Sequence, residues 1–198
     1  MAFKELVDAI EEKSSKHRDR LIAVYIGVLA VALAICSVGA GNATKDATAR
    51  NIEAANAWAF FQAKNIRRND IRLQIDTLEL KLATEPDLPP AARTTIEEKL
   101  KGYRAYEARL TSEPETGEGT EELKVRGKTL EERRDYAMRK DPYFDYGQAL
   151  LQIAIVLASV SIITGGTSLL VMSILLASCG AILTLNGFTL AYALPYIG

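Results

Sequence analysis

Paired carboxylates are the side chains in this sequence that are best suited to acid–base chemistry. They occur at Glu97-Glu98, Glu121-Glu122 and Glu131-Glu132, where Lys and Arg residues alternate with them at helical spacing. Acid–base catalysis needs two titratable groups whose environments push their pKa values apart. Interleaved charges of both signs are instead typical of a solvated helix face. We therefore expect no catalytic residue and no enzyme activity.

Metal and cofactor chemistry has few side chains to use. His17 is the single histidine, and the two cysteines, Cys36 and Cys179, lie in separate apolar segments. A zinc site requires clustered Cys and His ligands. No glycine-rich run followed by Lys-Ser or Lys-Thr is present to cradle a phosphate. The sequence predicts neither a metal ion nor a bound cofactor.

One cluster of cations lies beside the aromatic residues Trp58 and Phe61, and it permits two interpretations. The cations can bind anionic lipid headgroups, or they can pair with carboxylates while the aromatic rings pack against neighbouring helices. The second interpretation is favoured because the formal net charge of the chain is only −1. For the same reason we expect no nucleic-acid partner. The lipid-headgroup candidates are Lys64, Arg67, Arg68 and Arg72.

The placement of charge indicates which elements position these residues. The chain contains 24 basic and 25 acidic residues, yet residues 21–44 and 146–198 contain none of them. About 20 apolar residues of helix cross a hydrocarbon core roughly 30 Å thick. The first stretch therefore fits one crossing and the second fits two, with a turn at Gly165-Gly166. The alternative, buried core helices of a soluble protein, is disfavoured because no soluble domain of this size needs so long an uncharged stretch.

These observations predict an all-α fold: three transmembrane helices plus an extramembrane helical hairpin or coiled-coil-like bundle. A removable signal peptide cleaved after Ala40 is the alternative to the first transmembrane helix, but the apolar stretch exceeds the usual length of such signals. The predicted parts are an amphipathic charged N-terminal tail (1–20), transmembrane helix 1 (21–41), a charged helical domain (44–145), transmembrane helix 2 (146–164) and transmembrane helix 3 (168–194).

Residues 44–84 lack Pro and Gly and therefore predict one long helix with two apolar faces. One stripe repeats every seven residues from Ile52 to Leu80, and another steps by four and three from Ile71 to Leu82, as in a coiled coil. A helix that is apolar on opposite faces must be covered on both. We expect its own chain to cover one face and a second copy the other. The packing candidates are Ile52, Trp58, Phe61, Ile66, Ile71, Leu73, Ile75, Leu78, Leu80 and Leu82.

Prolines within residues 85–90 predict the end of this helix. Thr95 with Glu98 resembles a capping box that begins the next helix. A third helix is expected after residue 119, with Leu123, Leu130 and Ala137 seven residues apart and Thr129 with Glu132 as another possible cap. The polar loop over residues 112–119 is expected to be mobile.

Small residues four positions apart predict close helix packing in the membrane. They suit contacts within one chain and self-association alike, and the candidates are Gly27, Ala177 and Ala181. Asn186 is interpreted as a polar contact between helices. No Asp, Glu, Lys or Arg lies within the apolar segments, which argues against a proton relay or a charge-coupled transporter.

The positive-inside rule suggests an orientation. Basic residues cluster just before the first crossing, so we expect a cytoplasmic N-terminus and a periplasmic charged domain. The reverse orientation stays open because Arg139 and Lys140 flank the second crossing.

The segment from Asn51 to Arg67, with Trp58, paired Phe residues, Gln62 and Lys64 at fixed spacing, resembles a bacterial membrane-protein family known only as a domain of unknown function. The resemblance covers most of the chain and implies a bacterial inner membrane and no established activity. Tails in the family are often rich in His, whereas this tail has only His17, which weakens any metal-binding interpretation.

The function expected from these features is self-assembly, as a structural, scaffolding or interaction module. Its partners would be the lipid bilayer, further copies of the chain and another membrane protein. Two alternatives stay open: a passive oligomeric channel or membrane-stress component, and an accessory subunit of a membrane enzyme complex.

Overall fold

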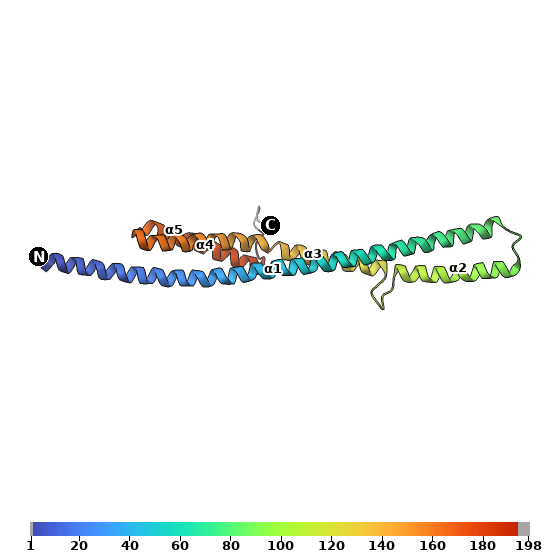
Figure 1. Cartoon of the computed structure of the whole chain (residues 1–198), viewed down its shortest axis with the longest axis horizontal. Coiled ribbons are helices and arrows are strands. Elements are labelled where there is room, and N and C mark those ends of the chain that lie inside the picture. Colours follow the sequence, from blue (N-terminus) through green and yellow to red (C-terminus); the bar gives the residue numbers. More distant parts are fainter. Residues whose placement is uncertain (1, 194–198) are drawn as a thin grey trace. The chain divides into compact units, whose positions relative to one another are not determined.

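A computed structural model describes residues 2–193, with side chains from residue 16 onward. Every regular element in this part of the chain is a helix, which confirms the predicted all-α fold. The predicted amphipathic face of residues 1–15 lies outside the described side chains. The helices are α1 (Ala2–Thr84), α2 (Pro90–Thr111), α3 (Thr120–Met138), α4 (Asp141–Thr164) and α5 (Thr167–Thr189), as Figure 1 shows.

Helix α1 is uninterrupted over 83 residues. The charged tail, the first apolar segment and the long charged segment are therefore parts of one helix, although the sequence suggested separate elements. Gly39 lies inside it, where a glycine ordinarily weakens a helix by about 0.5–1 kcal/mol. Packing compensates at this point, because Gly39 is buried directly against the ring of Phe144.

The chain divides into two compact units, which are described separately. The apolar unit comprises Met1–Ala47 and Asp135–Gly198, and the charged unit comprises Thr48–Arg134. Three helical stretches in the described chain are long and apolar enough to cross a membrane, within Lys16–Thr84, Thr120–Thr164 and Thr167–Thr189. Their length and composition fit a membrane protein. The five-part division of the chain stays a prediction, because helix ends do not locate a bilayer.

The turn predicted at Gly165-Gly166 is confirmed. Helix α4 ends at Thr164 and α5 begins at Thr167, with Gly165 in the left-handed conformation at φ 67°. That conformation is unfavourable for residues with a Cβ atom. The guanidinium of Arg18 donates a hydrogen bond of 3.2 Å to the carbonyl oxygen of Gly165. The turn therefore lies beside the N-terminal end of the apolar segment of α1.

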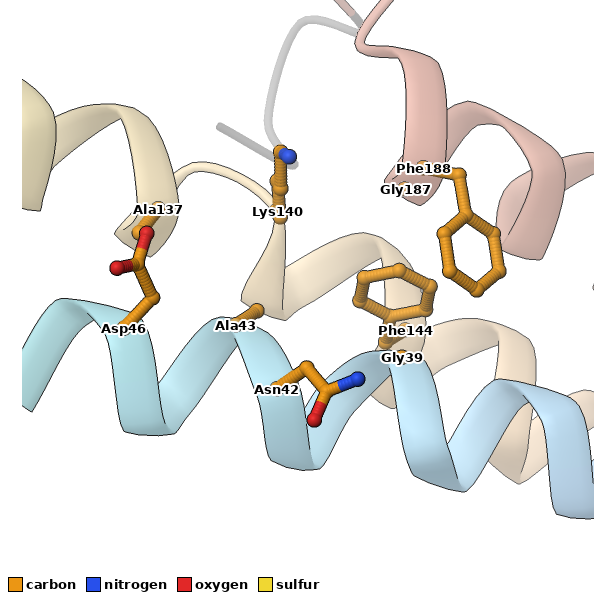
Figure 2. Close-up of a pocket in the computed structure, with 9 residues that line it drawn as sticks. All are labelled: Gly39, Asn42, Ala43, Asp46, Ala137, Lys140, Phe144, Gly187 and Phe188. Carbon is orange, nitrogen blue, oxygen red and sulfur yellow. The ribbon is translucent and has the colours of Figure 1, made fainter.

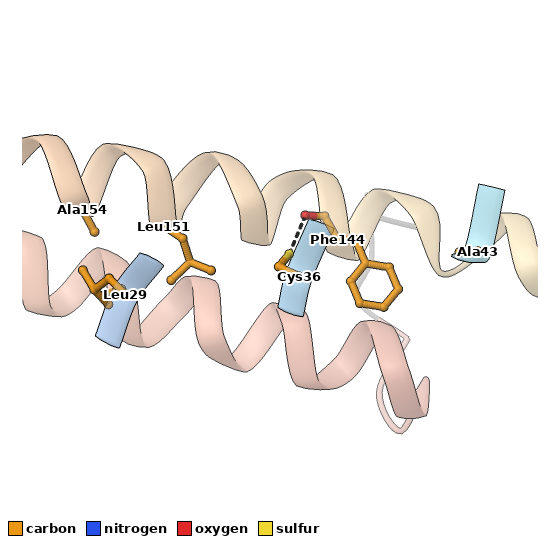
Figure 3. Close-up of a cluster of buried hydrophobic side chains, with 7 residues drawn as sticks. Leu29, Cys36, Ala43, Phe144, Leu151 and Ala154 are labelled. Atoms are coloured by element: carbon orange, nitrogen blue, oxygen red, sulfur yellow. Dashed lines mark hydrogen bonds between the residues drawn. The ribbon is translucent and has the colours of Figure 1, made fainter. Parts of the chain in front are cut away.

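The core of the apolar unit joins α1, α4 and α5 (Figure 3). Cys36 is fully buried, and its thiol donates to the carbonyl oxygen of Phe144 at 3.3 Å. Ser173 of α5 is also fully buried and donates to the carbonyl oxygen of Ala154 at 2.7 Å. Small side chains thus let these helices approach closely, while hydroxyl and thiol groups satisfy backbone carbonyls in an apolar setting.

Asn186 does not join two helices, so that interpretation was wrong. Its amide nitrogen donates to the carbonyl oxygen of Tyr192 at 2.8 Å, and its amide oxygen accepts from the backbone N–H of Tyr192 at 3.0 Å. Leu190 adopts a left-handed conformation between them. The side chain therefore fastens the segment that follows α5 back onto the end of that helix. A hydrogen-bonding side chain near a helix end commonly satisfies such local backbone groups.

In the charged unit, both proposed capping boxes were wrong. Helix α2 begins at Pro90, because a proline is well suited to the first helical position. Thr95 therefore lies inside the helix, where its hydroxyl donates to the carbonyl oxygen of Ala91 at 2.9 Å. Helix α3 begins at Thr120, so Thr129 is likewise internal and donates to the carbonyl oxygen of Val125.

Candidate functional site

One face of α1 in the charged unit is covered by the chain itself. Its buried and half-buried positions alternate by three and four residues, which is the spacing of a helix that packs lengthwise against others. The covered positions are Ala54, Ala57, Phe61, Lys64, Arg68, Ile71, Ile75, Leu78 and Leu82.

Helices α2 and α3 cover this face in succession. Buried Leu130 of α3 forms a small core with Ala54 and Ala57 of α1. Leu100 and Leu110 are the buried residues of α2. Ion pairs on the exposed flank link α2 to α1, between Arg72 and Glu107 and between Arg104 and Glu79. Exposed pairs contribute little stability, about 0–1 kcal/mol each, but they favour one alignment of the helices.

The opposite face of α1 carries an apolar stripe that no part of the charged unit covers. We call Ile52, Ala59, Ile66, Leu73 and Leu80 the outer stripe. Its four large members have between 56% and 64% of their surface exposed to solvent, and Ala59 is exposed as well. Scattered apolar residues on a surface need no explanation. A row that repeats every seven residues along one helix instead has the form of an association surface.

Trp58 is fixed at the contact between α1 and α3. Its indole N–H donates to a carboxylate oxygen of Glu131 at 2.9 Å, and its ring meets Phe61 edge to face, 5.6 Å between centroids. Gly127 of α3 lies against the same ring: a Cβ atom there would be 2.8 Å from the indole. The absence of a side chain at Gly127 therefore makes room for the Trp58 ring.

The four lipid-headgroup candidates do not form one exposed patch. Lys64 is only 8% exposed, and its ammonium lies 3.8 Å from Glu113 and 3.6 Å from Glu118. Arg68 donates to Thr120 at 3.2 Å and to Asn65 at 2.7 Å. Arg67 and Arg72 are exposed, and Arg72 pairs with Glu107. Binding of lipid by these residues stays a prediction.

The loop between α2 and α3 is linked to both helices by hydrogen bonds, and its expected mobility stays a prediction. The Ser112 hydroxyl donates to Glu122 at 2.6 Å, and the backbone N–H of Glu113 donates to the same carboxylate at 3.2 Å. These hydrogen bonds, chiefly that from Ser112, lower the pKa of Glu122 because they stabilise its charged form. The Arg109 guanidinium, 2.7 Å away, likewise lowers the pKa of Glu113.

The small-residue candidates of the apolar unit occupy different environments. Ala177 is buried in the core shared by the three helices, and Ala181 is half-buried. Gly27 is exposed on α1, and a Cβ atom added to it would meet nothing within 4 Å. Of these three residues, only Gly27 therefore lies on a surface that is open to another molecule, and its role in assembly stays a prediction.

Sequence reasoning missed the ion pairs of Lys64 because both partners come from a loop about fifty residues away. Periodicity did carry one signal: Lys64 occupies a position of the covered face, where a charge requires partners. Among residues 16–193, no three His, Cys, Asp or Glu side chains are grouped so that they could hold a metal ion.

Comparison with known protein families gives one finding. A family model described as "Domain of unknown function (DUF4337)" matches residues 18–190. That range includes all of α2 to α5 and all but the first residues of α1. No curated protein and no solved structure matches the chain.

Proposed function

The chain belongs to the DUF4337 family, a domain of unknown function, and from that premise we propose that it is a self-assembling structural or interaction module of a membrane. The observation that carries the proposal is the outer stripe. Its large side chains stay more than half exposed although α2 and α3 cover the other face of the same helix. A second copy of the chain is the occupant that we propose for it.

The energetics favour assembly within a bilayer over assembly in solution. Full burial of a Leu or Ile side chain contributes about 1.5–3 kcal/mol, and association costs roughly 4–15 kcal/mol. The four partly exposed side chains on each of two copies contribute a total comparable to that cost, so assembly in solution would be marginal. Membrane anchoring raises the effective concentration of neighbouring copies, and an exposed Gly27 permits close approach of their apolar helices.

The shared orientation of copies in one membrane predicts the geometry of the contact. Their α1 helices run parallel, so each outer-stripe residue faces its own equivalent across a two-fold interface. Leu73 would then lie beside Leu73 of the neighbouring copy. This arrangement differs from binding of an unrelated membrane protein, in which no stripe residue meets its own counterpart.

Cysteine cross-linking in native membranes tests this arrangement. A Leu73→Cys variant, made with Cys179→Ser to remove the exposed native thiol, should oxidise to a species of twice the chain mass. Val125→Cys in α3 is the matched control, because Val125 is 66% exposed and Leu73 is 64% exposed. Equal dimer yields from both variants, or no dimer from Leu73→Cys, would contradict the proposal.

We also propose that the protein lies in a bacterial inner membrane with its N-terminus in the cytoplasm and its charged unit in the periplasm. The basic residues before the first apolar segment support this orientation. Glu115 is exposed in the α2–α3 loop, so Glu115→Cys offers a labelling position. A membrane-impermeant thiol reagent that passes the outer membrane should label it in intact cells. Labelling only after disruption of the inner membrane would reverse the orientation.

A further inference from the structure

The serines midway along α5 are paired with backbone carbonyls. The buried Ser173 hydroxyl donates to the carbonyl oxygen of Ala154 at 2.7 Å. The exposed Ser178 hydroxyl also has a partner, because it donates to the carbonyl oxygen of Ile174 at 2.8 Å. A hydrocarbon core provides no water, so a polar group that lies in it needs a partner from protein.

Gln152 of α4 differs from these serines. Its side chain is exposed, and no hydrogen bond joins it to another of the described residues. Gln148, one turn earlier, is half-buried and makes none with the described residues either, but it lies only three residues beyond Asp145 and can extend toward the charged end of the helix. A carboxamide carries two N–H donors and an acceptor oxygen. Gln152 therefore presents unused hydrogen-bonding groups on the surface of an apolar helix.

The inward face of α4 is filled by other side chains. Leu151, the neighbour of Gln152 in sequence, is buried at 1% exposure. Nearer the start of the helix, Phe144 meets Phe188 of α5 edge to face with 4.9 Å between ring centroids, and both rings line a pocket beside Gly39 of α1 (Figure 2). Gln152 lies outside these packed positions, so α1 and α5 of the same chain do not supply its partner.

Gln152 lies within the hydrocarbon core of any bilayer that α4 crosses. The uncharged part of this helix, residues 146–164, is about as long as the roughly 20 residues that one crossing takes. One crossing therefore uses nearly all of it, whichever residues meet the headgroups. Gln152 lies seven residues beyond Asp145, which is about 10 Å along the helix. Lipid chains provide neither donor nor acceptor there, so contact with lipid alone leaves the carboxamide unsatisfied.

The surface around Gln152 has the form of a helix-packing face. Ala149, Gln152, Val156 and Ile163 are all exposed, at steps of three, four and seven residues that place them in one row along α4. We call these four residues the Gln152 face. Val156 and Ile163 have 60% and 85% of their surface exposed, and Ala149 is small enough to let another backbone approach closely. The face shares no residue with the outer stripe.

We propose that the Gln152 face is a further contact between copies of this chain, in which the Gln152 carboxamide hydrogen-bonds to Gln152 of the neighbouring copy. The proposal rests on the self-assembly proposed above but not on the outer stripe. Copies that share an orientation in one membrane have parallel α4 helices, so each residue of the face meets its own equivalent across a two-fold axis. Two carboxamides that meet in this way can each donate one N–H and accept one. Another membrane protein would need a polar side chain at this depth, whereas a second copy always has one.

Association of the full chain in lipid vesicles tests the contact. Energy transfer between copies that carry donor or acceptor fluorophores on an N-terminal tag would be measured at decreasing protein-to-lipid ratios. Gln152→Leu keeps a side chain of similar size and removes the carboxamide, so we expect the dissociation constant to rise about tenfold. For a glutamine that contacts only lipid, the same substitution would leave association unchanged. Ser178→Ala is the matched control, because the exposed Ser178 hydroxyl already bonds within its own helix.

Disulfide cross-linking in native membranes identifies the partner. Ala149→Cys, made with Cys179→Ser, keeps Gln152 and places a thiol one turn away on the same face. We expect an oxidised species of twice the chain mass, with a several-fold lower yield when Gln152→Leu is added. The unsubstituted chain is the control, because its exposed Cys179 lies on α5 at a similar depth, next to Gly180, which packs against Leu150. It should yield little dimer.

Each outcome decides the proposal. An unchanged dissociation constant in Gln152→Leu, an equal rise in Ser178→Ala, or a cross-linked product of any mass other than twice that of the chain would overturn it. Circular dichroism of each variant establishes that the helices remain folded. Association that is unchanged in Gln152→Leu but lost in Ile66→Ser/Leu73→Ser would overturn this contact and leave self-assembly in place. Strictly single copies of the unsubstituted chain would overturn both.

Discussion

Single side chains determine how the helices of the charged unit align, because the seven-residue pattern alone permits several alignments. Trp58 donates a hydrogen bond to Glu131 and packs edge to face against Phe61, and its ring fits against α3 because Gly127 has no side chain. Lys64 is held by two carboxylates of one loop. Most of these contacts join residues that are distant in sequence, so composition and periodicity could not reveal them.

Replacing Gly127 should show how closely α3 approaches Trp58. The Cβ atom of Gly127→Ala would lie 2.8 Å from the indole, so we expect a loss of about 1–3 kcal/mol in the free energy of unfolding. Gly102→Ala is the control, because its Cβ meets nothing within 4 Å and alanine favours a helix. Fluorescence of Trp58, the single tryptophan, reports unfolding in denaturant. Equal effects of the two substitutions would disprove the close contact.

Two acidic groups, Glu113 in the α2–α3 loop and Glu122 in the first turn of α3, should make the charged unit sensitive to acid. The pKa values of Glu113 and Glu122 are lowered in the folded chain. Their ionised carboxylates therefore stabilise the folded state, and this stabilisation is fully present above the ordinary glutamate pKa of about 4.3. It is lost as the pH falls through the lowered values. Ser112→Ala removes the main hydrogen bond to Glu122, so its pKa should rise toward the ordinary value. An NMR titration of the Glu122 carboxyl measures the shift, and an unchanged pKa would contradict this cause.

At the scale of elements, the sequence predicts best the helix boundaries that Pro or Gly residues mark. Prolines end α1 near Thr84, and paired glycines separate α4 from α5, because both residue types act locally on the backbone. The beginning of α2 was misplaced at Thr95, because several Thr residues offer similar caps and α2 instead begins at Pro90. The unbroken course of α1 was missed as well, since it depends on packing around Gly39.

The α2–α3 loop should loosen when its cation on α1 is removed. Lys64→Gln leaves Glu113 and Glu118 without the buried ammonium, so amide hydrogens of residues 112–119 should exchange about tenfold faster. Arg67→Gln is the matched control, because Arg67 is exposed and only three positions away. Exchange followed by mass spectrometry measures both variants. Identical exchange in Lys64→Gln and the unsubstituted chain would show that the loop is held by other contacts.

At the scale of the whole molecule, three apolar helical stretches and one charged helical unit are combined in a chain of the DUF4337 family. Charge placement and periodicity in the sequence were enough to indicate the three apolar stretches and the charged helical unit. Periodicity also indicated that α1 has two apolar faces, of which one faces α2 and α3. The outer stripe stays uncovered by the charged unit, and a second copy of the chain is the occupant that we propose for it.

Polar substitution of the outer stripe should weaken assembly without unfolding the chain. Ile66→Ser with Leu73→Ser removes two exposed apolar side chains, at 61% and 64% exposure, that lie outside the covered face. We expect the dissociation constant for self-association to rise at least tenfold. Val125→Ser, which removes a side chain of 66% exposure from α3, should leave it unchanged.

The most decisive test of self-assembly is the mass of the purified full chain in a native-like bilayer disc, measured by light scattering or native mass spectrometry. We predict particles that contain two or more copies, and a shift toward single copies for the Ile66→Ser/Leu73→Ser variant but not for Val125→Ser. Strictly single copies of the unsubstituted chain at every protein-to-lipid ratio would contradict self-assembly.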